Sequence, residues 1–562
     1  MDYRSPIARR IALCLALACV AALAFFVHRS TRRHGVQIPN ASTAAVASAG
    51  DAALPIDLTR DQLTQSILDG LRKPVMGRMP SLGDVARVAD QCGPIIAEAT
   101  LQPETQAGLD QMAQDEGITR EDARERWVHL QEADLLLESG GDPDALSGAG
   151  AAGVAQWMPG KGGHGVFPTD LPASRRLTSS IDTLKRRIAW VEYWSQTPEN
   201  ARAPAPASVG PALTSAQAAA QLPVLRARLT ALREQRRRLD PRYDPRRAIF
   251  AQTNYLLNLY PRFPGGDWLF QAYHGGEAGV QRTLKKYLAS EWPGSAAAAI
   301  RYGDAGSRLS FEQVYLTSEP RRHAAAFSYL YGRGDDHRHY WWKLRAAQEA
   351  IALYRRDPAE FRRQWEALMP GRSTDALWYG ATLAIPNTAA LTAATERGEL
   401  TSLSGVPGVV LSRPAQPIVA RPEARGALAL VAGVYQHVGG NLPLTLGDAA
   451  LSQQDAVWLA ANAPSPAQAG PPEPDIRPGG GPLANFNAHT TGVVFDLERP
   501  SDRNARKILE YALGYWKDRQ VLWWKEERDD GVRRYHVAPN PAYRLALARI
   551  GATGAIPATP GL

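Results

Sequence analysis

One helix that ends on a carboxylate constrains this chain more than any other stretch. Thr119 begins the helix with the pattern Thr-Arg-Glu-Asp, which predicts a capping box. Apolar residues then recur at helical spacing, at Trp127, Leu130, Ala133 and Leu137. Gly140 and Gly141 end the helix, so Glu138 stands at the end of an apolar face, directly before a loop rich in Gly, Ala, Asp and Ser.

The Glu138 carboxyl is expected to lose water by packing near Leu136, Leu137 and Trp127. Because burial disfavours the charged form, it raises the pKa of a carboxyl and keeps the group protonated near neutral pH. A protonated carboxyl can serve as a general acid. A lone glutamate at a helix end is more often an exposed charge, so the neighbouring residues must decide between the two interpretations.

The stretch from Leu135 to Pro159 resembles the catalytic segment of the lytic transglycosylases, in the goose-type-lysozyme-like superfamily. In that family Glu-Ser is followed by Pro-x-Ala-x-Ser, a Gly-Ala-x-Gly turn and Gln-x-Met-Pro. The matching residues are Glu138, Ser139, Pro143, Ala145, Ser147, Gly150, Ala151, Gly153, Gln156, Met158 and Pro159. The resemblance implies that Glu138 is the catalytic residue, that Ser139 hydrogen-bonds the acid and that Gln156 hydrogen-bonds the sugar.

Later segments are similar to this family in the same order, so the resemblance covers about residues 115–350. YDPRRAIFAQTNYLLNLY looks like the family helix that follows an Asp-Pro start. QAYHGGEAGV puts Tyr273 on the family tyrosine, with His274 in place of the usual Asn. DDHRHYWWKLRAA resembles the terminal helix and puts Tyr340 on its tyrosine. The resemblance implies that Tyr273 and Tyr340 shape the cleft and position Glu138.

The family reaction needs one carboxyl, whereas ordinary glycosidases need two, roughly 5 to 9 Å apart. By analogy, Glu138 protonates the oxygen between N-acetylmuramic acid and N-acetylglucosamine, then takes the C6 hydroxyl proton as a 1,6-anhydro ring closes. We interpret Asp134 as a surface or capping charge and Asp142 with Pro143 as a turn. Acting as a second carboxylate, Asp134, Asp142 or Asp144 would favour hydrolysis, so a hydrolytic muramidase stays as an alternative.

An insertion at about 165–242 interrupts the resemblance. It contains two long helical patterns, 178–196 and 214–237, joined by a Pro/Ala stretch, and the second includes the basic run LRARLTALREQRRRL. We expect a solvated helical hairpin, with a polyanion-binding arm as the alternative. The net charge of +8 suits an anionic polymer without choosing among nucleic acid, lipid and cell-wall glycan.

The apolar run IALCLALACVAALAFFV, residues 11–27, predicts a membrane anchor within residues 1–34, with a cleaved signal peptide as the alternative. Residues 35–56 then form a linker. Because an anchor of this kind implies export, we expect a single-pass protein of the bacterial inner membrane with its catalytic domains in the periplasm. Export also argues against a nucleic-acid partner and favours peptidoglycan.

The sequence after Pro386 changes to β-branched residues, Pro and Gly. Residues 386–482 are expected to be a Pro/Gly-rich segment that leads into a second domain, whereas strand-like and helix-like runs alternate in 483–562. NAHTTGVVFDLERP places His489 and Asp496 around a glycine, and RRYHVAPNP supplies His536. These residues resemble the zinc D-alanyl-D-alanine carboxypeptidases.

That resemblance implies a zinc site formed by His489, Asp496 and His536, with one position left for water. Arg533 stands where the family has its glutamate base, and Glu526 or Glu527 are candidate substitutes. An active peptidase, an inert remnant and a peptide-binding module all stay open.

The predicted fold is therefore multidomain: a transmembrane helix, a mainly α lysozyme-like domain at 57–385 with a helical-hairpin insertion, and a smaller α+β domain. The predicted function is that of a peptidoglycan lytic transglycosylase without a cofactor for that reaction. A non-catalytic peptidoglycan-binding scaffold is the alternative from another class.

Overall fold

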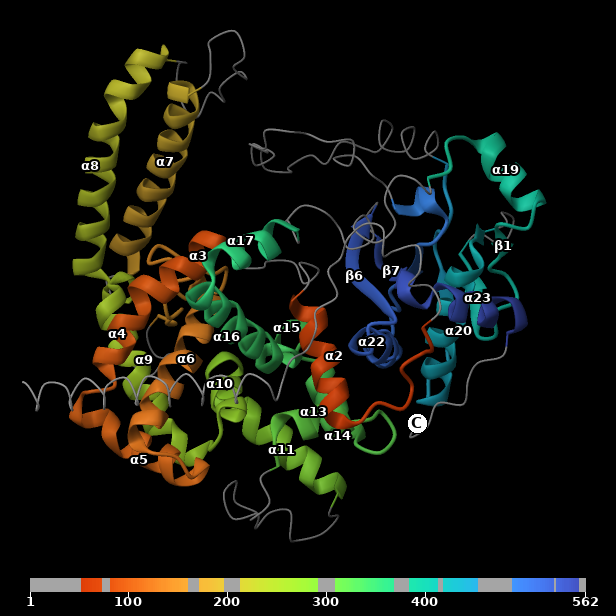
Figure 1. Cartoon of the computed structure of the whole chain (residues 1–562), viewed down its shortest axis with the longest axis horizontal. Helices are drawn as coiled ribbons and strands as arrows, with labels where there is room; N and C mark the ends of the chain where they lie inside the picture. Colours follow the sequence, from red (N-terminus) through yellow and green to blue (C-terminus); the bar gives the residue numbers. More distant parts are fainter. Residues whose placement is uncertain are drawn as a thin grey trace, which may run out of the picture. The chain divides into compact units, whose positions relative to one another are not determined.

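The computed structural model describes residues 52–72, 81–159, 171–196, 213–291, 309–367, 384–412, 418–452, 488–529 and 532–554 (Figure 1). Residues 52–562 group into one compact unit. The predicted anchor at 11–27 lies outside the described residues. In the ranges above, no helix is both long enough and apolar enough to cross a bilayer. The described chain is mainly helical with a small sheet, which confirms that part of the prediction.

The helical region runs from the N-terminal end of the described chain to residue 367. Its elements are α2 (Arg60–Arg72), α3 (Leu82–Arg87), η3 (Val88–Cys92), α4 (Gly93–Ala99), α5 (Pro103–Glu116), α6 (Arg120–Ser139), α7 (Leu171–Gln196), α8 (Ser215–Leu239), η7 (Pro241–Tyr243), α9 (Pro245–Leu259), η8 (Tyr260–Arg262), α10 (Gly266–Gly275), α11 (Glu277–Glu291), α13 (Phe311–Thr317), α14 (Ala324–Tyr331), α15 (Asp335–Arg338), α16 (Tyr340–Arg356) and α17 (Pro358–Ala367).

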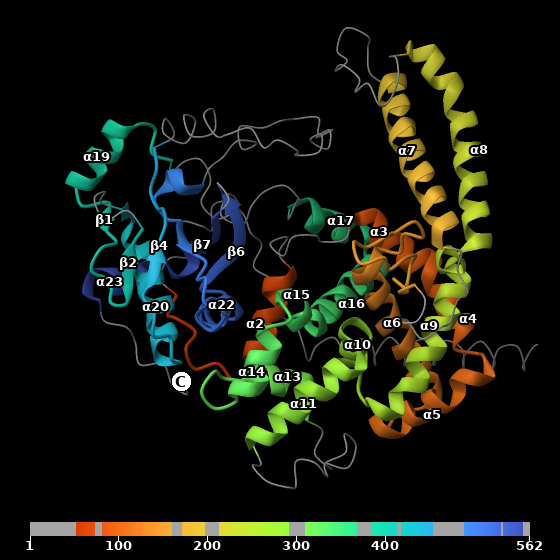
Figure 2. The ribbon, with the colours of Figure 1, turned by 180° about the vertical axis from the view of Figure 1, so that it is seen from behind.

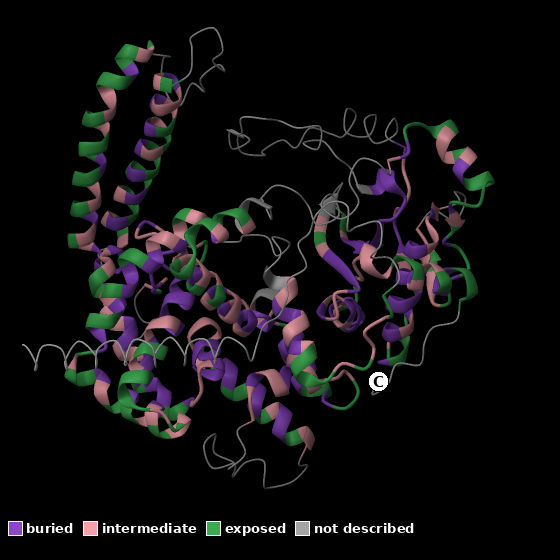
Figure 3. Ribbon diagram, viewed as in Figure 1, coloured by how far each residue is buried: buried purple, intermediate pink, exposed green. Residues whose placement is uncertain are grey.

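α6 forms as the sequence predicts. The Thr119 side chain accepts from the Asp122 amide, and the Asp122 carboxylate accepts from the Thr119 amide, which completes the capping box. Gly140 takes φ 64°, a left-handed conformation that ends the helix. α4, α5 and α16 pack around α6, and its C-terminal half is buried without a break from Leu130 to Leu136 (Figure 3).

α7 and α8 form the predicted hairpin and lie side by side in both views (Figures 1 and 2). Separate small apolar clusters hold the two helices together, one of them built from Ile181, Leu184, Ile188 and Leu229. Exposed residues cover the outer sides of both helices (Figure 3). The hairpin is therefore an amphipathic pair with its own small core.

Asp144 ties this hairpin to the loop that follows α6. Lys185 Nζ of α7 lies 2.8 Å from Asp144 Oδ2, and Arg233 Nε of α8 donates to the same oxygen at 2.8 Å. Arg236 pairs with Oδ1 and places its guanidinium 3.6 Å from the centroid of the Tyr243 ring. Burial alone would raise the pKa of Asp144. The hydrogen bonds and positive charges of these three residues have the larger effect, so the pKa is lowered to about 2. Part of the basic face thus anchors the hairpin.

The sheet region follows from residue 384. In the part of the chain that the structure describes, one sheet has the strand order β2-β4-β5-β7-β6, with β2 and β4 parallel and the other neighbours antiparallel. Its elements, with a separate β1–β3 pair, are α19 (Thr388–Glu396), β1 (Thr401–Ser402), β2 (Val409–Leu411), β3 (Val419–Ala420), α20 (Pro422–His437), β4 (Leu444–Leu446), η10 (Ala488–Thr491), β5 (Phe495–Glu498), α22 (Arg503–Asp518), β6 (Leu522–Asp529), β7 (Val532–Pro539), η11 (Pro541–Tyr543) and α23 (Arg544–Thr553).

The expected boundary at 483 is too late. β2 and β4 come from the segment 386–482 but belong to the same sheet as β5, β6 and β7. α20 comes from that segment too, and it packs against α22 and α23. Because β2 and β4 have 3 residues each, they are too short to produce an alternating pattern in the sequence.

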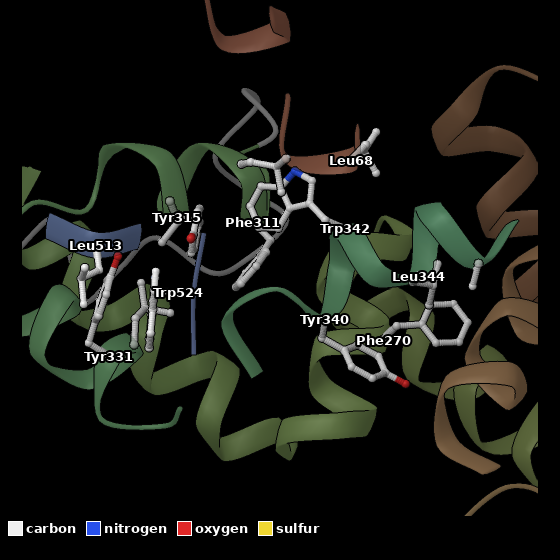
Figure 4. Close-up of a cluster of buried hydrophobic side chains, with 14 of the residues drawn as sticks. Leu68, Phe270, Phe311, Tyr315, Tyr331, Tyr340, Trp342, Leu344, Leu513 and Trp524 are labelled. Atoms are coloured by element: carbon white, nitrogen blue, oxygen red, sulfur yellow. The ribbon is translucent and has the colours of Figure 1, made fainter. Parts of the chain in front are cut away.

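One buried apolar cluster continues from the helical region into the sheet region (Figure 4). Polar contacts also join the two regions. The Tyr315 hydroxyl lies 2.8 Å from His339 Nε2 and 3.0 Å from Asp518 Oδ2 at the end of α22. His339 is the N-cap residue of α16, directly before Tyr340. The sheet region therefore supports the start of α16.

Candidate active site and candidate metal centre

Glu138 lies in the last turn of α6, and 14% of its side chain is exposed. Its Oε1 accepts a hydrogen bond from the Tyr340 hydroxyl at 2.8 Å and lies 3.1 Å from His274 Nδ1. None of the described residues donates a hydrogen bond to Oε2. A sheltered carboxyl that keeps one oxygen open can exchange a proton with a bound molecule.

Asp134 lies one turn before Glu138 and is fully buried. The Tyr340 hydroxyl is 2.6 Å from Asp134 Oδ1, so it lies between the two carboxyls. Burial, and then the charge of Glu138, raise the pKa of Asp134 well above its usual range. The interpretation of Asp134 as a surface or capping charge is therefore wrong.

A chain of buried side chains continues behind Asp134. Gln252 of α9 donates to Asp134 Oδ2 at 2.8 Å. Gln131 donates to Gln252 Oε1 at 2.9 Å, and Gln131 Oε1 accepts from the Trp127 indole at 2.9 Å. Since buried polar groups cost free energy unless they are paired, this chain fixes the relative position of α6 and α9 behind Glu138.

His274 contacts Glu138, and the sequence did not predict this contact. Besides its contact with Oε1, its ring stacks on Tyr340, with centroids 3.9 Å apart and planes at 13°. The His337 ring stacks nearby, at 5.5 Å from His274. The available signal in the sequence was His274 in QAYHGG, at a position where the transglycosylase motif has Asn, because an imidazole can donate to a carboxylate as an amide does.

Ser139 does not bond the acid in this structure. Its hydroxyl donates to Val154 O at 2.6 Å and lies 3.2 Å from Leu135 O, while the Gly141 amide donates to Ser139 Oγ at 3.1 Å. These partners are backbone groups. Ser139 therefore holds the loop that follows α6, residues 140–159 and here named the motif loop, against the end of that helix.

Tyr273 and Gln156 act on the same loop. The Tyr273 hydroxyl donates to Ala155 O at 2.5 Å, and its ring packs edge-on against Trp157. Gln156 has φ 49°, unusual for a residue other than glycine, and its side-chain amide donates to Gly153 O at 2.9 Å. The structure brings Glu138, Ser139, Gln156, Tyr273 and Tyr340 together through this loop and the helices beside it.

Arg242 locks the other side of the loop. Its Nη1 donates to Gly150 O and to Trp157 O, at 3.0 Å each. Gly153 has φ 74°, and a Cβ there would lie 1.8 Å from Arg242 O. Only glycine fits this approach without displacing the backbone.

His489, Asp496 and His536 form a second buried cluster, in the sheet region. One ligand atom from each lies within 4.8 Å of the others. Asp496 on β5 pairs directly with His536 on β7, which places His536 Nδ1 3.0 Å from Asp496 Oδ1. η10 brings His489 Nε2 to 3.2 Å from the same oxygen. Sheet register thus joins residues that are distant in the sequence.

The hydrogen bonding of His489 favours a cation in this cluster. His489 Nδ1 lies 2.9 Å from Ala449 O, and because a carbonyl only accepts, Nδ1 carries the hydrogen. A neutral His489 then directs a lone pair at the Asp496 oxygen, and a proton or a metal ion between them relieves that contact. A backbone carbonyl that orients a metal-binding histidine is a common arrangement in zinc sites.

Of the two candidate glutamate bases, one faces away from this cluster and the other is held in an ion pair. Arg533, where the zinc carboxypeptidase pattern has a glutamate, is exposed and pairs with Glu526 at 3.2 Å. Lys525 is the cross-strand partner of His536, so alternation puts Glu526 on the opposite face of the sheet. Glu527 shares the face of His536 but forms an ion pair with Lys525.

Comparison of the chain with models of known protein families, with curated proteins and with solved structures finds no match in any of the three. Functional inference therefore rests on the motif residues and on the geometry of the two sites.

Proposed function

We propose that the chain is a peptidoglycan lytic transglycosylase in which Glu138 is both acid and base. The setting of Glu138 supports this most: its carboxyl meets the Tyr340 hydroxyl and the His274 imidazole, and Ser139 holds the motif loop against the same helix end. A carboxyl with donors on one oxygen and the other oxygen open suits alternating loss and gain of a proton.

The first half of the reaction breaks the glycosidic bond. Protonated Glu138 gives its proton from Oε2 to the oxygen between N-acetylmuramic acid and N-acetylglucosamine, and the bond from that oxygen to C1 breaks. The acetamido group of the muramic acid stabilises the cation at C1. Tyr340 and His274 stabilise the Glu138 carboxylate that forms, since hydrogen bonds to a charged group are roughly twice as strong as neutral ones.

The second half closes a ring in place of hydrolysis. The Glu138 carboxylate takes the proton of the C6 hydroxyl, and the C6 oxygen bonds to C1 to give the 1,6-anhydro product. Glu138 is protonated again at the end, so the cycle balances without water. A second carboxylate that activates water is not required.

The test is product analysis of sacculi digested with the purified full-length protein. Anhydro ends resist borohydride reduction, whereas hydrolytic reducing ends accept two hydrogens, and mass spectrometry separates them. We expect anhydro products from wild type, and none from Glu138→Gln. Glu125→Gln is the matched control, because Glu125 lies on the same helix with 77% of its side chain exposed. Reducing ends alone would identify a muramidase, and binding without turnover a scaffold.

We also propose that His489, Asp496 and His536 hold zinc. Two imidazoles and a carboxylate suit this ion, which would supply Lewis-acid polarisation of a peptide carbonyl when bound. Among the described residues, Glu526 lies on the opposite face of the sheet and Glu527 is paired with Lys525, so we propose metal binding without a peptidase step. Equal zinc content in wild type and His489→Ala would contradict this proposal.

We propose further that residues 11–27 anchor the chain in the bacterial inner membrane with the described residues in the periplasm. The support is the uncharged apolar run between arginines at both ends. Alkaline extraction of membranes tests it, since an anchored protein stays with the lipid.

A further inference from the structure

The Tyr340 hydroxyl has one hydrogen and two carboxyl neighbours. It lies 2.6 Å from Asp134 Oδ1 and 2.8 Å from Glu138 Oε1. If both carboxyls were ionised, Tyr340 could satisfy only one of them, and the other contact would set lone pairs against each other in a buried space. One of the two carboxyls must therefore donate to Tyr340.

The chain of amides behind Asp134 shows where a proton can sit. The Trp127 indole is only a donor, so Gln131 Oε1 must face it. Gln131 then presents its NH₂ group to Gln252 Oε1, and Gln252 presents its own NH₂ group to Asp134 Oδ2. Asp134 Oδ2 is therefore an acceptor, and any proton on Asp134 lies on Oδ1, facing Tyr340.

Burial makes Asp134 the carboxyl that carries this proton. Asp134 is 0% exposed, and the described residues around it include no Lys or Arg ion pair to it, whereas Glu138 retains an exposed edge. The titratable groups around Asp134 are Glu138 on its own helix, Tyr273 and His274 on α10, and Tyr340 on α16. The α9 contact is the neutral Gln252. Desolvation and the Glu138 charge both favour the neutral form of Asp134.

We propose that Asp134 is a positioning residue that stays protonated and, by donating to Tyr340, directs the tyrosine hydrogen onto Glu138 Oε1. The proposal rests on the proposed function of Glu138. In the acid form, Asp134 donates to Tyr340, Tyr340 donates to Glu138 Oε1, and Glu138 keeps its own proton on Oε2 for the sugar. Once that proton has left, the same two bonds support the carboxylate until it takes the C6 proton. Asp134 itself gains and loses nothing.

The test uses the difference between a neutral and an ionised Asp134. Asparagine reproduces the protonated pattern, because its NH₂ group can donate to Tyr340 while its oxygen accepts from Gln252. Asp134→Asn should therefore keep anhydro-product formation within about threefold of wild type, while Asp134→Ala should lose about tenfold or more. Asp110→Asn, at a half-exposed aspartate that pairs with Arg120 on the surface, is the matched control and should match wild type.

Two further readouts separate positioning from general stability. Tyr340→Phe should lose about tenfold or more, and adding Asp134→Asn to it should change nothing further. The pH profile of kcat/KM should be nearly the same in Asp134→Asn and wild type, because the proposal gives Asp134 no titration in the working range. A loss in folded Asp134→Asn as complete as in Glu138→Gln would overturn the proposal, since it would mean that Asp134 acts as a carboxylate.

A measurement without activity keeps this inference distinct from the proposed function. NMR titration of ¹³C-labelled aspartate carboxyls in wild type, assigned with Asp134→Asn, should show Asp134 protonated at neutral pH. An ionised Asp134 would overturn the inference even if anhydro products form. A protonated Asp134 together with no anhydro product from any variant would uphold the hydrogen-bond assignment and defeat the proposed function instead.

Discussion

The two candidate sites of this chain are positioned in different ways. At Glu138, side chains from four helices meet, and a chain of side-chain hydrogen bonds runs from Trp127 through Gln252 and Asp134 to Tyr340 and Glu138 Oε1. At His489, Asp496 and His536, the backbone does most of the positioning, because two ligands are opposite one another on β5 and β7 and the third bonds a backbone carbonyl. A site held by side chains depends on residues far behind it, whereas a site held by sheet register depends mainly on its own ligands.

The largest effects are expected when a variant of each site is measured for the activity of both sites. This tests whether the two sites are independent. Glu138→Gln should lower anhydro-product release by at least about a thousandfold and leave zinc content unchanged. His489→Ala should abolish zinc binding, measured by elemental analysis, and keep anhydro activity within about twofold, since its surroundings do not include Glu138. Loss of glycan cleavage in folded His489→Ala would break the comparison.

Gly153→Ala tests the backbone packing of the motif loop. The new Cβ would meet Arg242 O at 1.8 Å, in a backbone conformation with φ 74°. We expect a loss of about 3 kcal/mol in the free energy of unfolding, measured with urea. Gly148→Ala is the control in the same loop, because a Cβ there meets nothing within 4 Å. Equal stability of the two variants would show that Arg242 does not fix the loop.

Asp144 tests whether the hairpin supports the helical site. Because its folded pKa is lowered to about 2, its stabilisation is present above the unfolded value and is lost as pH falls from about 4 towards 2. Asp144→Asn should therefore cost about 2 kcal/mol at pH 7 and progressively less below pH 4. Urea unfolding of both proteins between pH 2 and 7 measures this. A cost that does not change with pH would argue against the ion cluster with Lys185, Arg233 and Arg236.

Gln252→Ala gives the smallest expected effect and tests the chain of amides. The substitution removes the partner of Asp134 Oδ2 and leaves Gln131 Nε2 with only its long contact to Ile249 O at 3.5 Å, at a cost of about 1–2 kcal/mol in the free energy of unfolding. Gln114→Ala, at an exposed position of α5, should change it by less than about 0.5 kcal/mol. The rate of anhydro-product formation by Gln252→Ala should fall by more than the loss of folded protein accounts for. Unchanged activity at full folding would show that the chain behind Asp134 does not serve the site.

Local patterns in the sequence were sufficient for some of these features and not for others. The capping box at Thr119, the stop at Gly140, the hairpin and the trio of candidate metal ligands all follow from residues close together in the chain or from a motif. The burial of Asp134 could not be predicted, because the residues that cover it, Gln252 and Tyr340, come from helices more than a hundred residues away.

The contact of His274 with Glu138 is likewise a product of the tertiary fold, as is the entry of β2 and β4 into the sheet. A single histidine after a tyrosine has no periodic signal, and a strand of 3 residues has almost none. Helix existence and caps are local properties, whereas the environment of a carboxyl depends on everything packed around it.

Digestion of sacculi in water labelled with ¹⁸O tests the central claim most directly. If Glu138 alone transfers the proton and the sugar closes its own ring, the muramic ends released by wild type contain no ¹⁸O and have one water fewer than a reducing end. Incorporation of one ¹⁸O at the new muramic end, lost in Glu138→Gln, would contradict the account, because water would then be the nucleophile and a second group would have to activate it.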